Sequence, residues 1–318
     1  RHMTKYERTP LTRFVAVATA ATREARNGTR FVRLVRETAG LGLHVVSGKE
    51  EARLVYLGLL SRVHVVGRAL VIDIGGGSTE IAVGDEEGAG IVASIPLGAI
   101  RLAAEGPPPA EGGRVKAADY ETLRRRVQLA AQHALRELGH PHPEATAYGT
   151  SGTIVNLAAV AARLLHERMP GRDEPLTRKD LRAVTKRLRA MTADQRRSVP
   201  GLSAARADII VAGAAILDTL MDDLGIETII ALDDCGLREG LLLDDLARAG
   251  RHELRRGADV RERSVLQLAR STSFDERHAR QVARLALELF DSARAARLHR
   301  LGPEERELLE YAALLHDI

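Results

Sequence analysis

The sequence of 318 residues has one cysteine, Cys235, no tryptophan and few aromatic residues. A single cysteine excludes an intrachain disulfide and is typical of a reducing compartment, so we expect a cytoplasmic protein. No apolar run reaches the roughly 18 residues needed to cross a bilayer, and no signal-peptide core is present, so we expect no membrane association. Because aromatics are 3% and hydrophobic residues 45% of the chain, the cores must be aliphatic, and the length predicts two or more domains.

The sequence also lacks an arginine-rich arm, aromatic residues interleaved with basic ones, and zinc-finger spacings. Its 47 basic and 43 acidic residues leave a net charge of +4, a small excess for this length. Such a balance is compatible with an anionic ligand but does not require nucleic acid. We therefore expect no nucleic-acid partner.

Strand and helix patterns alternate as far as about Leu246, which predicts an α/β part, and helical patterns alone follow. The expected strands include residues 14–20, 43–48, the stretch from Val71, an antiparallel pair at 81–84 and 90–98, and one beginning at Thr228. The expected helices cover 22–40, 49–63, 119–138, 176–199 and 206–225, then 263–268, 275–290 and 303–316. The Arg- and Gly-rich segment 248–259 is the expected linker between the two parts.

A glycine loop follows an apolar strand in "VIDIGGGSTE". Gly75, Gly76 and Gly77 can adopt positive φ and let backbone N–H groups approach an anion, and Ser78 adds a hydroxyl donor. An acid stands on each side of this loop, Asp73 before it and Glu80 after it. Because acids repel phosphate oxygens unless a cation lies between them, the pattern predicts a phosphate site with Mg²⁺ held by Asp73 and Glu80. The spacing matches neither a P-loop nor a dinucleotide fingerprint.

A second loop of the same kind occurs in "AYGTSGTIVNLA". It places a glycine–hydroxyl segment between a short strand and the start of a helix, whose N-terminal amides attract negative charge. Its predicted phosphate-binding residues are Gly149, Thr150, Ser151, Gly152 and Thr153. Two such loops in one α/β part predict two clamps on one polyanion.

The third candidate feature is the glutamate pair Glu50–Glu51 in "SGKEEARLVYLG". Acids are favoured in the first turn of a helix by the helix dipole, which is the structural explanation. The functional interpretation makes one of the two a general base that orients water onto phosphorus.

Together these segments resemble the exopolyphosphatase/guanosine pentaphosphate phosphohydrolase (Ppx/GppA) family, within the acetate kinase–sugar kinase–Hsp70–actin superfamily. The segments that carry the resemblance are "VATAATREARNG", "VVSGKEEARLVYLG", "VIDIGGGSTEIAVG", "SIPLGAIRL", "YGTSGT" and "DDCGLREGLLLD". The resemblance implies an α/β fold of ribonuclease-H-like, actin-like ATPase lobes. It places the remainder of a first lobe in residues 1–58, the second lobe in 59–247, and the start of an all-helical HD-like domain in 254–318.

The resemblance also implies residue roles. It makes Glu51 the catalytic base, Asp73 and Glu80 the residues that hold magnesium or orient water, and the two glycine loops the phosphate sites. It gives Arg23 a phosphate-binding or structural role and Arg238 a structural one, pairing with neighbours at a hinge between lobes. A monovalent cation besides Mg²⁺, and a homodimer, are left open.

Two departures from the family pattern stand out. The family's first lobe opens on a strand with an aspartate–glycine–serine–asparagine turn, and nothing before Thr12 matches it, so half of the cleft is expected to be missing from these residues. In the helical part, His278, His316 and Asp317 match HD-type ligands, which leaves a second divalent metal open. A fourth ligand, an aspartate, is expected beyond Ile318.

The resemblance implies a hydrolase that releases terminal phosphate from inorganic polyphosphate, the 5′-phosphate of guanosine pentaphosphate, or both. Two alternatives stay open: a module that binds polyphosphate or a guanosine penta- or tetraphosphate alarmone with little turnover, and an HD-type metal phosphohydrolase in the helical part. A sugar or acetate kinase shares the glycine loop but gives "SGKEEAR" no role.

Overall fold

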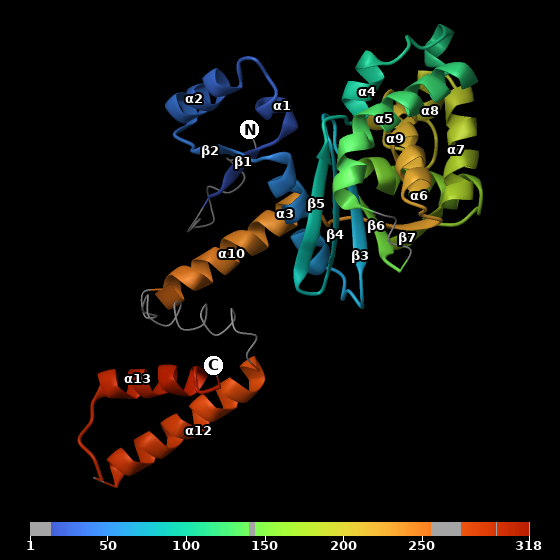
Figure 1. Cartoon of the computed structure of the whole chain (residues 1–318). Helices are drawn as coiled ribbons and strands as arrows, with labels where there is room; N and C mark the ends of the chain where they lie inside the picture. The colour runs from blue at the N-terminus through green and yellow to red at the C-terminus, as the bar shows by residue number, and fades with distance from the viewer. Residues whose placement is uncertain (1–13, 140–143, 256–274, 297, 318) are drawn as a thin grey trace. The chain divides into compact units, whose positions relative to one another are not determined.

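The computed structural model describes residues 14–139, 144–255, 275–296 and 298–317. The chain divides between Asp245 and Leu246 into an α/β unit and a helical unit (Figure 1). Helix α10 (Leu237–Arg255) crosses this division, so the expectation of a linker over 248–259 is wrong as far as Arg255, where the chain is helical. The expected helix 263–268 lies outside the described residues.

The α/β unit opens with β1 (Ala16–Ala18), α1 (Ala20–Arg23), α2 (Gly28–Ala39), β2 (Leu43–Val45) and α3 (Gly48–Leu60). It continues with β3 (Ala69–Ile74), β4 (Thr79–Asp85), β5 (Gly88–Ile95), α4 (Ala99–Glu105), the 3₁₀ turn η2 (Glu111–Gly113), α5 (Ala117–Leu138), β6 (Thr146–Thr150) and α6 (Ser151–Leu164). It closes with β7 (Asp173–Thr177), α7 (Arg178–Ala190), α8 (Ala193–Arg197), η3 (Ala204–Arg206), α9 (Ile210–Asp223), β8 (Thr228–Leu232) and α10.

Six strands form one mixed sheet in the order β5-β4-β3-β6-β8-β7. Strands β3, β6 and β8 run parallel, while β4, β5 and β7 are antiparallel to their neighbours. The expected antiparallel hairpin β4–β5 is confirmed, with Asp85 paired to Gly88 across its turn. The carboxyl ends of β3, β6 and β8 therefore meet at one edge, the usual place for ligands in open α/β sheets.

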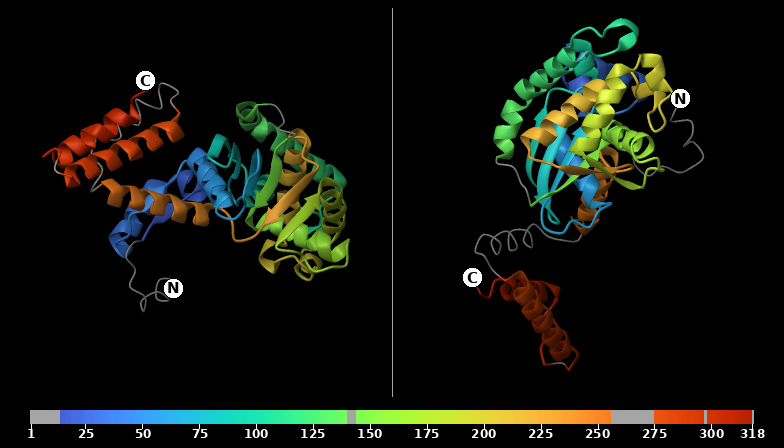
Figure 2. Two further views of the ribbon diagram at one scale, coloured as in Figure 1. Left: turned by 90° about the horizontal axis from the view of Figure 1, so that it is seen from below. Right: turned by 90° about the vertical axis from the view of Figure 1, so that its right-hand side faces the viewer.

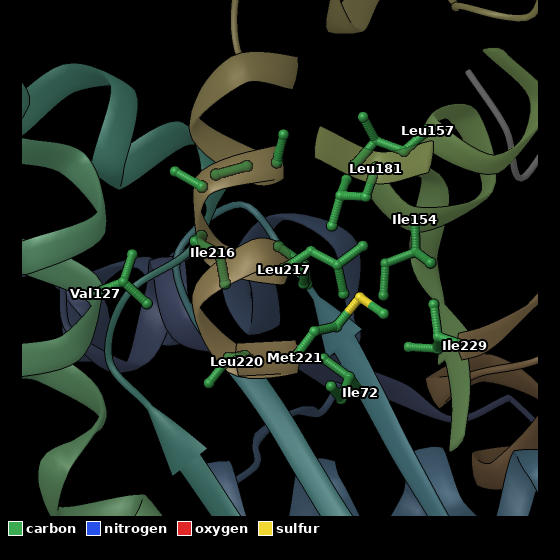
Figure 3. Packing of buried hydrophobic residues seen from close by; sticks show 14 of the residues in the cluster. Ile72, Val127, Ile154, Leu157, Leu181, Ile216, Leu217, Leu220, Met221 and Ile229 are labelled. Atoms are coloured by element: carbon green, nitrogen blue, oxygen red, sulfur yellow. The ribbon is translucent and has the colours of Figure 1, made fainter. Parts of the chain in front are cut away.

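Helices cover both faces of this sheet, because the central strands are apolar on both sides (Figures 1 and 2). Alternate residues of β3 divide between the two cores: Leu70 and Ile72 face the larger one, and Ala69 and Val71 the smaller. The larger core is aliphatic, and α9 is its centre (Figure 3). Its labelled members are Ile72, Val127, Ile154, Leu157, Leu181, Ile216, Leu217, Leu220, Met221 and Ile229.

Helix α3 packs on the other face of the sheet, where Val55, Tyr56 and Leu59 join the smaller core. A one-sided amphipathic helix is expected from its spacing, yet α3 is buried nearly all round because α10 covers its other side. Gly58 lies against the carbonyl of Gly236, and Gly240 against that of Leu54.

Strand β7 is absent from the sequence-based expectations, which place a helix from Leu176. The helix instead begins at Arg178, with the Thr177 hydroxyl accepting the N–H of Asp180 as its N-cap. Pro175 is tolerated because β7 pairs on one side only, as the edge strand beside β8.

The helical unit contains α12 (Glu276–Ala295) and α13 (Pro303–Leu314), as expected from the sequence. The two helices pack through Ala283, Ala313 and Leu314, as the antiparallel pair in Figure 2 shows. Among the described residues, no helix is long and apolar enough to cross a membrane.

Candidate active site

The predicted site residues of the α/β unit gather at the carboxyl ends of β3, β6 and β8. Asp73 is the register partner of Glu80 on β4 and of Thr150 on β6. Beside them lies a cavity of about 290 Å³. It is lined by Asp73, Ile74, Gly75, Gly76, Ser151, Gly152, Arg206 and the segment from Leu232 to Glu239.

The first glycine loop closes the β3–β4 hairpin, with the Gly75 N–H donating to the Ser78 carbonyl at 3.0 Å. The expectation of positive φ at Gly75, Gly76 and Gly77 is wrong, since none of the three has it. Glycine is required here for close approach instead. A Cβ at Gly76 would lie 2.9 Å from Ile100, and one at Gly77 3.1 Å from Ala20.

This close approach lets the start of α4 bind the loop. The N–H groups of Ala99 and Ile100 donate to the carbonyls of Gly75 and Gly76 at 2.9 and 3.0 Å. The carbonyls of Gly75 and Gly76 are thus hydrogen-bonded to α4. The N–H groups of Gly76, Gly77 and Ser78, in contrast, donate no hydrogen bond to any described residue. Three adjacent amides without acceptors are the donor set that an anion would use.

The second loop turns from β6 into α6 at Thr150 and Ser151. Ser151 has φ of 79°, a left-handed conformation that costs free energy for a residue with a side chain. The buried hydroxyls of Thr150 and Ser151 form no hydrogen bond within the described residues, although both lie close enough to Asp73 to favour its charged form. Buried hydroxyls rarely lack partners, so these two indicate a missing ligand or water.

Glu51 lies in the first turn of α3 with only 10% of its side chain exposed. Its Oε2 is 3.2 Å from Nη1 of Arg23, which also donates to the Val46 carbonyl at 2.9 Å. Burial raises the pKa of Glu51 above its ordinary value, and the Arg23 guanidinium partly offsets this. Through these two contacts Arg23 links Val46, which precedes α3, to the predicted base Glu51.

Glu50 is held differently from its neighbour. Both of its carboxylate oxygens accept hydrogen bonds from Arg53, each at 2.8 Å, and Arg53 also donates to Asp244 at 2.9 Å. The bidentate ion pair with Arg53 ties Glu50 to the α3–α10 contact, while Glu51 lies near enough to Asp73 and Glu80 to raise their pKa values.

The pKa values of Asp73 and Glu80 lie well above the ordinary values of these carboxyl groups. Burial, together with repulsion by Glu51, raises the pKa of Asp73 to about 6 and that of Glu80 to about 8. Ser94 on β5 donates to Oε1 of Glu80 at 3.0 Å and fixes its orientation. Acids that resist ionisation beside one another fit a divalent cation, which would relieve the repulsion.

The oxygen ligands at this site also match the coordination that Mg²⁺ prefers. Magnesium usually takes one or two protein carboxylates and fills its octahedron with waters and phosphate oxygens. Asp73 and Glu80 supply two carboxylates, and the unpartnered hydroxyls of Thr150 and Ser151 lie beside Asp73. The oxygens of Glu51, Asp73 and Glu80 do not all lie within 4.8 Å of one another, since among the described residues only one cluster elsewhere meets that criterion.

Sequence patterns did not reveal Arg206, which the fold brings to the second loop. Its guanidinium covers Gly152, where a Cβ would lie 2.3 Å from Nη2, and its Nη1 is 3.4 Å from the Thr153 hydroxyl. The structural role expected for Arg238 stays a prediction. Its side chain lines the cavity, is 86% exposed, and forms an ion pair with the adjacent Glu239 at 3.9 Å.

The three HD-type residues of the helical unit also lie together. The ligand atoms of His278, His316 and Asp317 all lie within 4.8 Å of one another, with Oδ2 of Asp317 3.5 Å from His278 and 3.2 Å from His316. The Ala313 carbonyl lies 2.9 Å from Nδ1 of His316, which leaves Nε2 toward Asp317. All three side chains are exposed.

The chain thus combines an α/β unit, which holds two glycine loops beside buried acids, with a helical unit after it. The chain belongs to the Ppx/GppA phosphatase family: the family's model matches residues 4–249, and that of Ppx/GppA phosphatase domain III matches 260–318. It is accordingly an enzyme that hydrolyses phosphoanhydride bonds, and the predicted fold class is confirmed.

Solved structures agree with this assignment. A Ppx/GppA family member of Aquifex aeolicus is 24% identical, with 78% of each chain covered and a TM-score of 0.63. The Aquifex aeolicus PPX-GPPA enzyme is 26% identical, with 76% of this chain and 78% of that one covered and a TM-score of 0.60. An exopolyphosphatase of Cytophaga hutchinsonii is 21% identical, with 77% and 78% covered and a TM-score of 0.67, and shows the shared fold.

Proposed function

We propose that the chain hydrolyses the terminal phosphoanhydride bond of inorganic polyphosphate, of the 5′-triphosphate of guanosine pentaphosphate, or of both. The observation that carries this proposal is the meeting of two glycine loops, with free amides and unpartnered hydroxyls, beside Asp73 and Glu80 and the predicted base Glu51. The similarity to an exopolyphosphatase supports the substrate class.

In the proposed mechanism Glu51 orients a water molecule and accepts its proton as the water oxygen attacks the terminal phosphorus. The bond from phosphorus to the bridging oxygen breaks, and the shortened chain leaves with that oxygen. The raised pKa of Glu51 suits this role because a general base works best when its pKa approaches the working pH. Arg23 holds the carboxylate in place through the 3.2 Å contact.

The loops stabilise the charge that spreads over the phosphoryl oxygens. The amides of Gly76, Gly77 and Ser78 and the hydroxyls of Thr150 and Ser151 provide preorganised donors, and Gly76 and Ser151 line the cavity. Asp73 and Glu80 would hold Mg²⁺, which when bound neutralises phosphate charge and polarises the phosphoryl oxygens. Arg206 adds a fixed positive charge beside the second loop.

The adjacent glutamates provide a matched test. Replacing Glu51 with Gln should lower phosphate release by roughly 10²-fold or more, because the variant keeps the shape of the side chain but accepts no proton. Glu50→Gln should keep near-wild-type turnover, since Glu50 pairs with Arg53 away from the loops. Release is measured with polyphosphate and with guanosine pentaphosphate, with and without Mg²⁺.

Near-full turnover in Glu51→Gln would contradict the assignment of the base, and an equal loss in Glu50→Gln would point to a shared structural role. Tight binding by calorimetry without magnesium-dependent release from the wild type would instead select a binding module.

A second candidate function is metal binding by the helical unit. The observation that favours it is the convergence of His278, His316 and Asp317 from two helix ends onto a region that one ion could fill. Imidazole and carboxylate together suit a first-row transition metal. Phosphohydrolase chemistry at that ion would make the helical unit a second active site, separate from the glycine loops.

A further inference from the structure

A second cavity, of about 250 Å³, lies between helices α5, α7 and α9 of the α/β unit. It shares no lining residue with the cavity beside the glycine loops, and the proposed mechanism uses none of its residues. Most of its lining side chains are charged. They are the cations Arg124, Arg182, Lys186 and Arg189 and the carboxylates Glu121 and Asp218.

The buried carboxylate of Asp218 holds two of these cations in place. Its Oδ1 accepts the Nε–H of Arg182 at 2.8 Å, and its Oδ2 lies 3.4 Å from Nε of Arg124. The Tyr120 hydroxyl donates to the same Oδ2 at 3.3 Å. Both arginines also pair with Asp222, at 2.9 Å from Arg124 and 3.2 Å from Arg182. Their guanidinium groups are therefore fixed before any ligand binds.

The other two cations of the cavity have no acidic partner. Lys186 forms no side-chain hydrogen bond or ion pair with any described residue, and Arg189 lies over the ring of Tyr120, 5.9 Å from its centroid, without pairing with an acid. The buried Nε of Arg124 also donates no hydrogen bond. Buried donors rarely lack an acceptor, so the cavity has donors for an oxygen-rich ligand.

Without a ligand this arrangement of charges is repulsive. Lys186 follows Arg182 by four residues and precedes Arg189 by three on α7, so the three cations share one face of the helix. Like charges at such spacings destabilise a helix. Four cations against two carboxylates leave an excess of two positive charges in the lining. An anion bound between α5 and α7 would neutralise this excess.

A single phosphate group matches that excess. A phosphate monoester carries about 1.5–2 negative charges near pH 7, and guanidinium groups bind phosphate oxygens in pairs. A chain of phosphates matches it less well, because each added group brings more negative charge toward Glu121 and Asp218.

We propose that the cavity between α5, α7 and α9 binds a single phosphate group, as free orthophosphate or as part of a small molecule, at a site separate from the glycine loops. Arg124 and Arg182 provide the fixed guanidinium donors. Lys186 and Arg189 provide the charge that no carboxylate neutralises. The site does not depend on the proposed function, because it shares no residue with the proposed active site.

Binding of orthophosphate and of AMP to the full chain, measured by calorimetry with Mg²⁺ chelated, tests the site. The double variant Lys186→Gln with Arg189→Gln should bind at least about tenfold more weakly than the wild type, since hydrogen bonds to charged groups are worth more than a decade in affinity. Both chains keep the glycine loops, so the difference between them isolates this cavity. A loss for orthophosphate identifies the free ion as a ligand, and a loss for AMP alone identifies a phosphate monoester.

A matched control removes two exposed cations outside the cavity, by Lys179→Gln and Arg172→Gln, and should bind both probes as the wild type does. Equal affinities in the wild type and the Lys186/Arg189 double variant would overturn the site. A larger loss for inorganic tripolyphosphate than for the other probes would show that the cavity takes chains, and would overturn the assignment to a single phosphate group.

Stability and turnover separate a ligand site from a structural role. Without phosphate, Lys186→Gln alone should be at least as stable as the wild type, because it removes repulsion, and added orthophosphate should stabilise it less than the wild type. Magnesium-dependent phosphate release by the double variant should be unchanged. A Lys186→Gln chain that is less stable without phosphate, or a double variant that loses turnover, would overturn the proposal of a separate site.

Discussion

Among single residues, Glu80 links the site to pH most directly, because it is buried on β4 between Asp73 and Ser94 and has a pKa of about 8. A carboxyl group with a raised pKa keeps its proton in the folded protein at pH values where the unfolded chain has lost it. The free energy of unfolding therefore falls as pH rises from the ordinary value of 4.5 toward 8. Asp73, with a pKa of about 6, adds to the lower part of this range.

Replacing Glu80 with Gln should remove most of this pH dependence. Between pH 5 and pH 8, and with divalent ions chelated, the wild type should lose on the order of 1–3 kcal/mol of stability relative to Glu80→Gln. Denaturant titrations at several pH values measure this, and saturating Mg²⁺ should flatten the wild-type curve by displacing the proton.

The exposed Glu86→Gln variant is the control for loss of an acid, and its curve should follow that of the wild type. Parallel curves for the wild type and Glu80→Gln would mean that Glu80 ionises normally in the folded chain.

At the scale of secondary-structure elements, α3 and α10 meet through glycine. A Cβ at Gly240 would lie 1.8 Å from the Leu54 carbonyl oxygen, and one at Gly58 would lie 2.2 Å from that of Gly236. These are backbone contacts, which no side-chain rotation can relieve. The helix that carries Glu51 is thus placed against α10 by the absence of side chains.

Gly240→Ala should destabilise the chain by about 1–3 kcal/mol or more, from overpacking. Helix propensity alone predicts the opposite sign, since alanine is favoured over glycine by about 1 kcal/mol inside a helix. Gly42→Ala, where the new methyl group has no atom within 4 Å, should have little effect. Chemical denaturation of the wild type, Gly240→Ala and Gly42→Ala compares their free energies of unfolding. A Gly240→Ala variant more stable than the wild type would show that α3 and α10 can move apart at little cost in free energy.

The same scale shows what the sequence could predict. Strands β3, β4, β5, β6 and β8 are apolar enough to be recognised. Strand β7 has one buried side and a proline, so its signal is weak, and the expected helix from Leu176 overlaps its last two residues. The loops and their acids follow from short motifs. Arg206 does not, because only tertiary packing brings its 3₁₀ turn over Gly152, and the glycine φ angles depend on how α4 docks.

At the scale of the whole molecule, the two candidate cation sites belong to different compact units. The carboxylates of Asp73 and Glu80 suit a hard cation such as Mg²⁺, whereas His278, His316 and Asp317 suit a softer transition metal. Dimerisation, and the division of the first 247 residues into two lobes, stay predictions. The metal sites, in contrast, can be separated in one experiment on the full chain.

His316→Ala should weaken Ni²⁺ binding at least about tenfold, because it removes one of the three side chains, at the ends of α12 and α13, that would bind the ion. Magnesium-dependent phosphate release should be unchanged, since sites without shared partners act additively. His133→Ala, which removes an exposed histidine from α5, is the matched control and should bind Ni²⁺ as the wild type does. Calorimetry with Ni²⁺ and a phosphate-release assay on the same preparations measure both effects. Undiminished Ni²⁺ binding by His316→Ala would show that the three side chains meet without forming a metal site, and lost phosphate release would show that the two sites depend on each other.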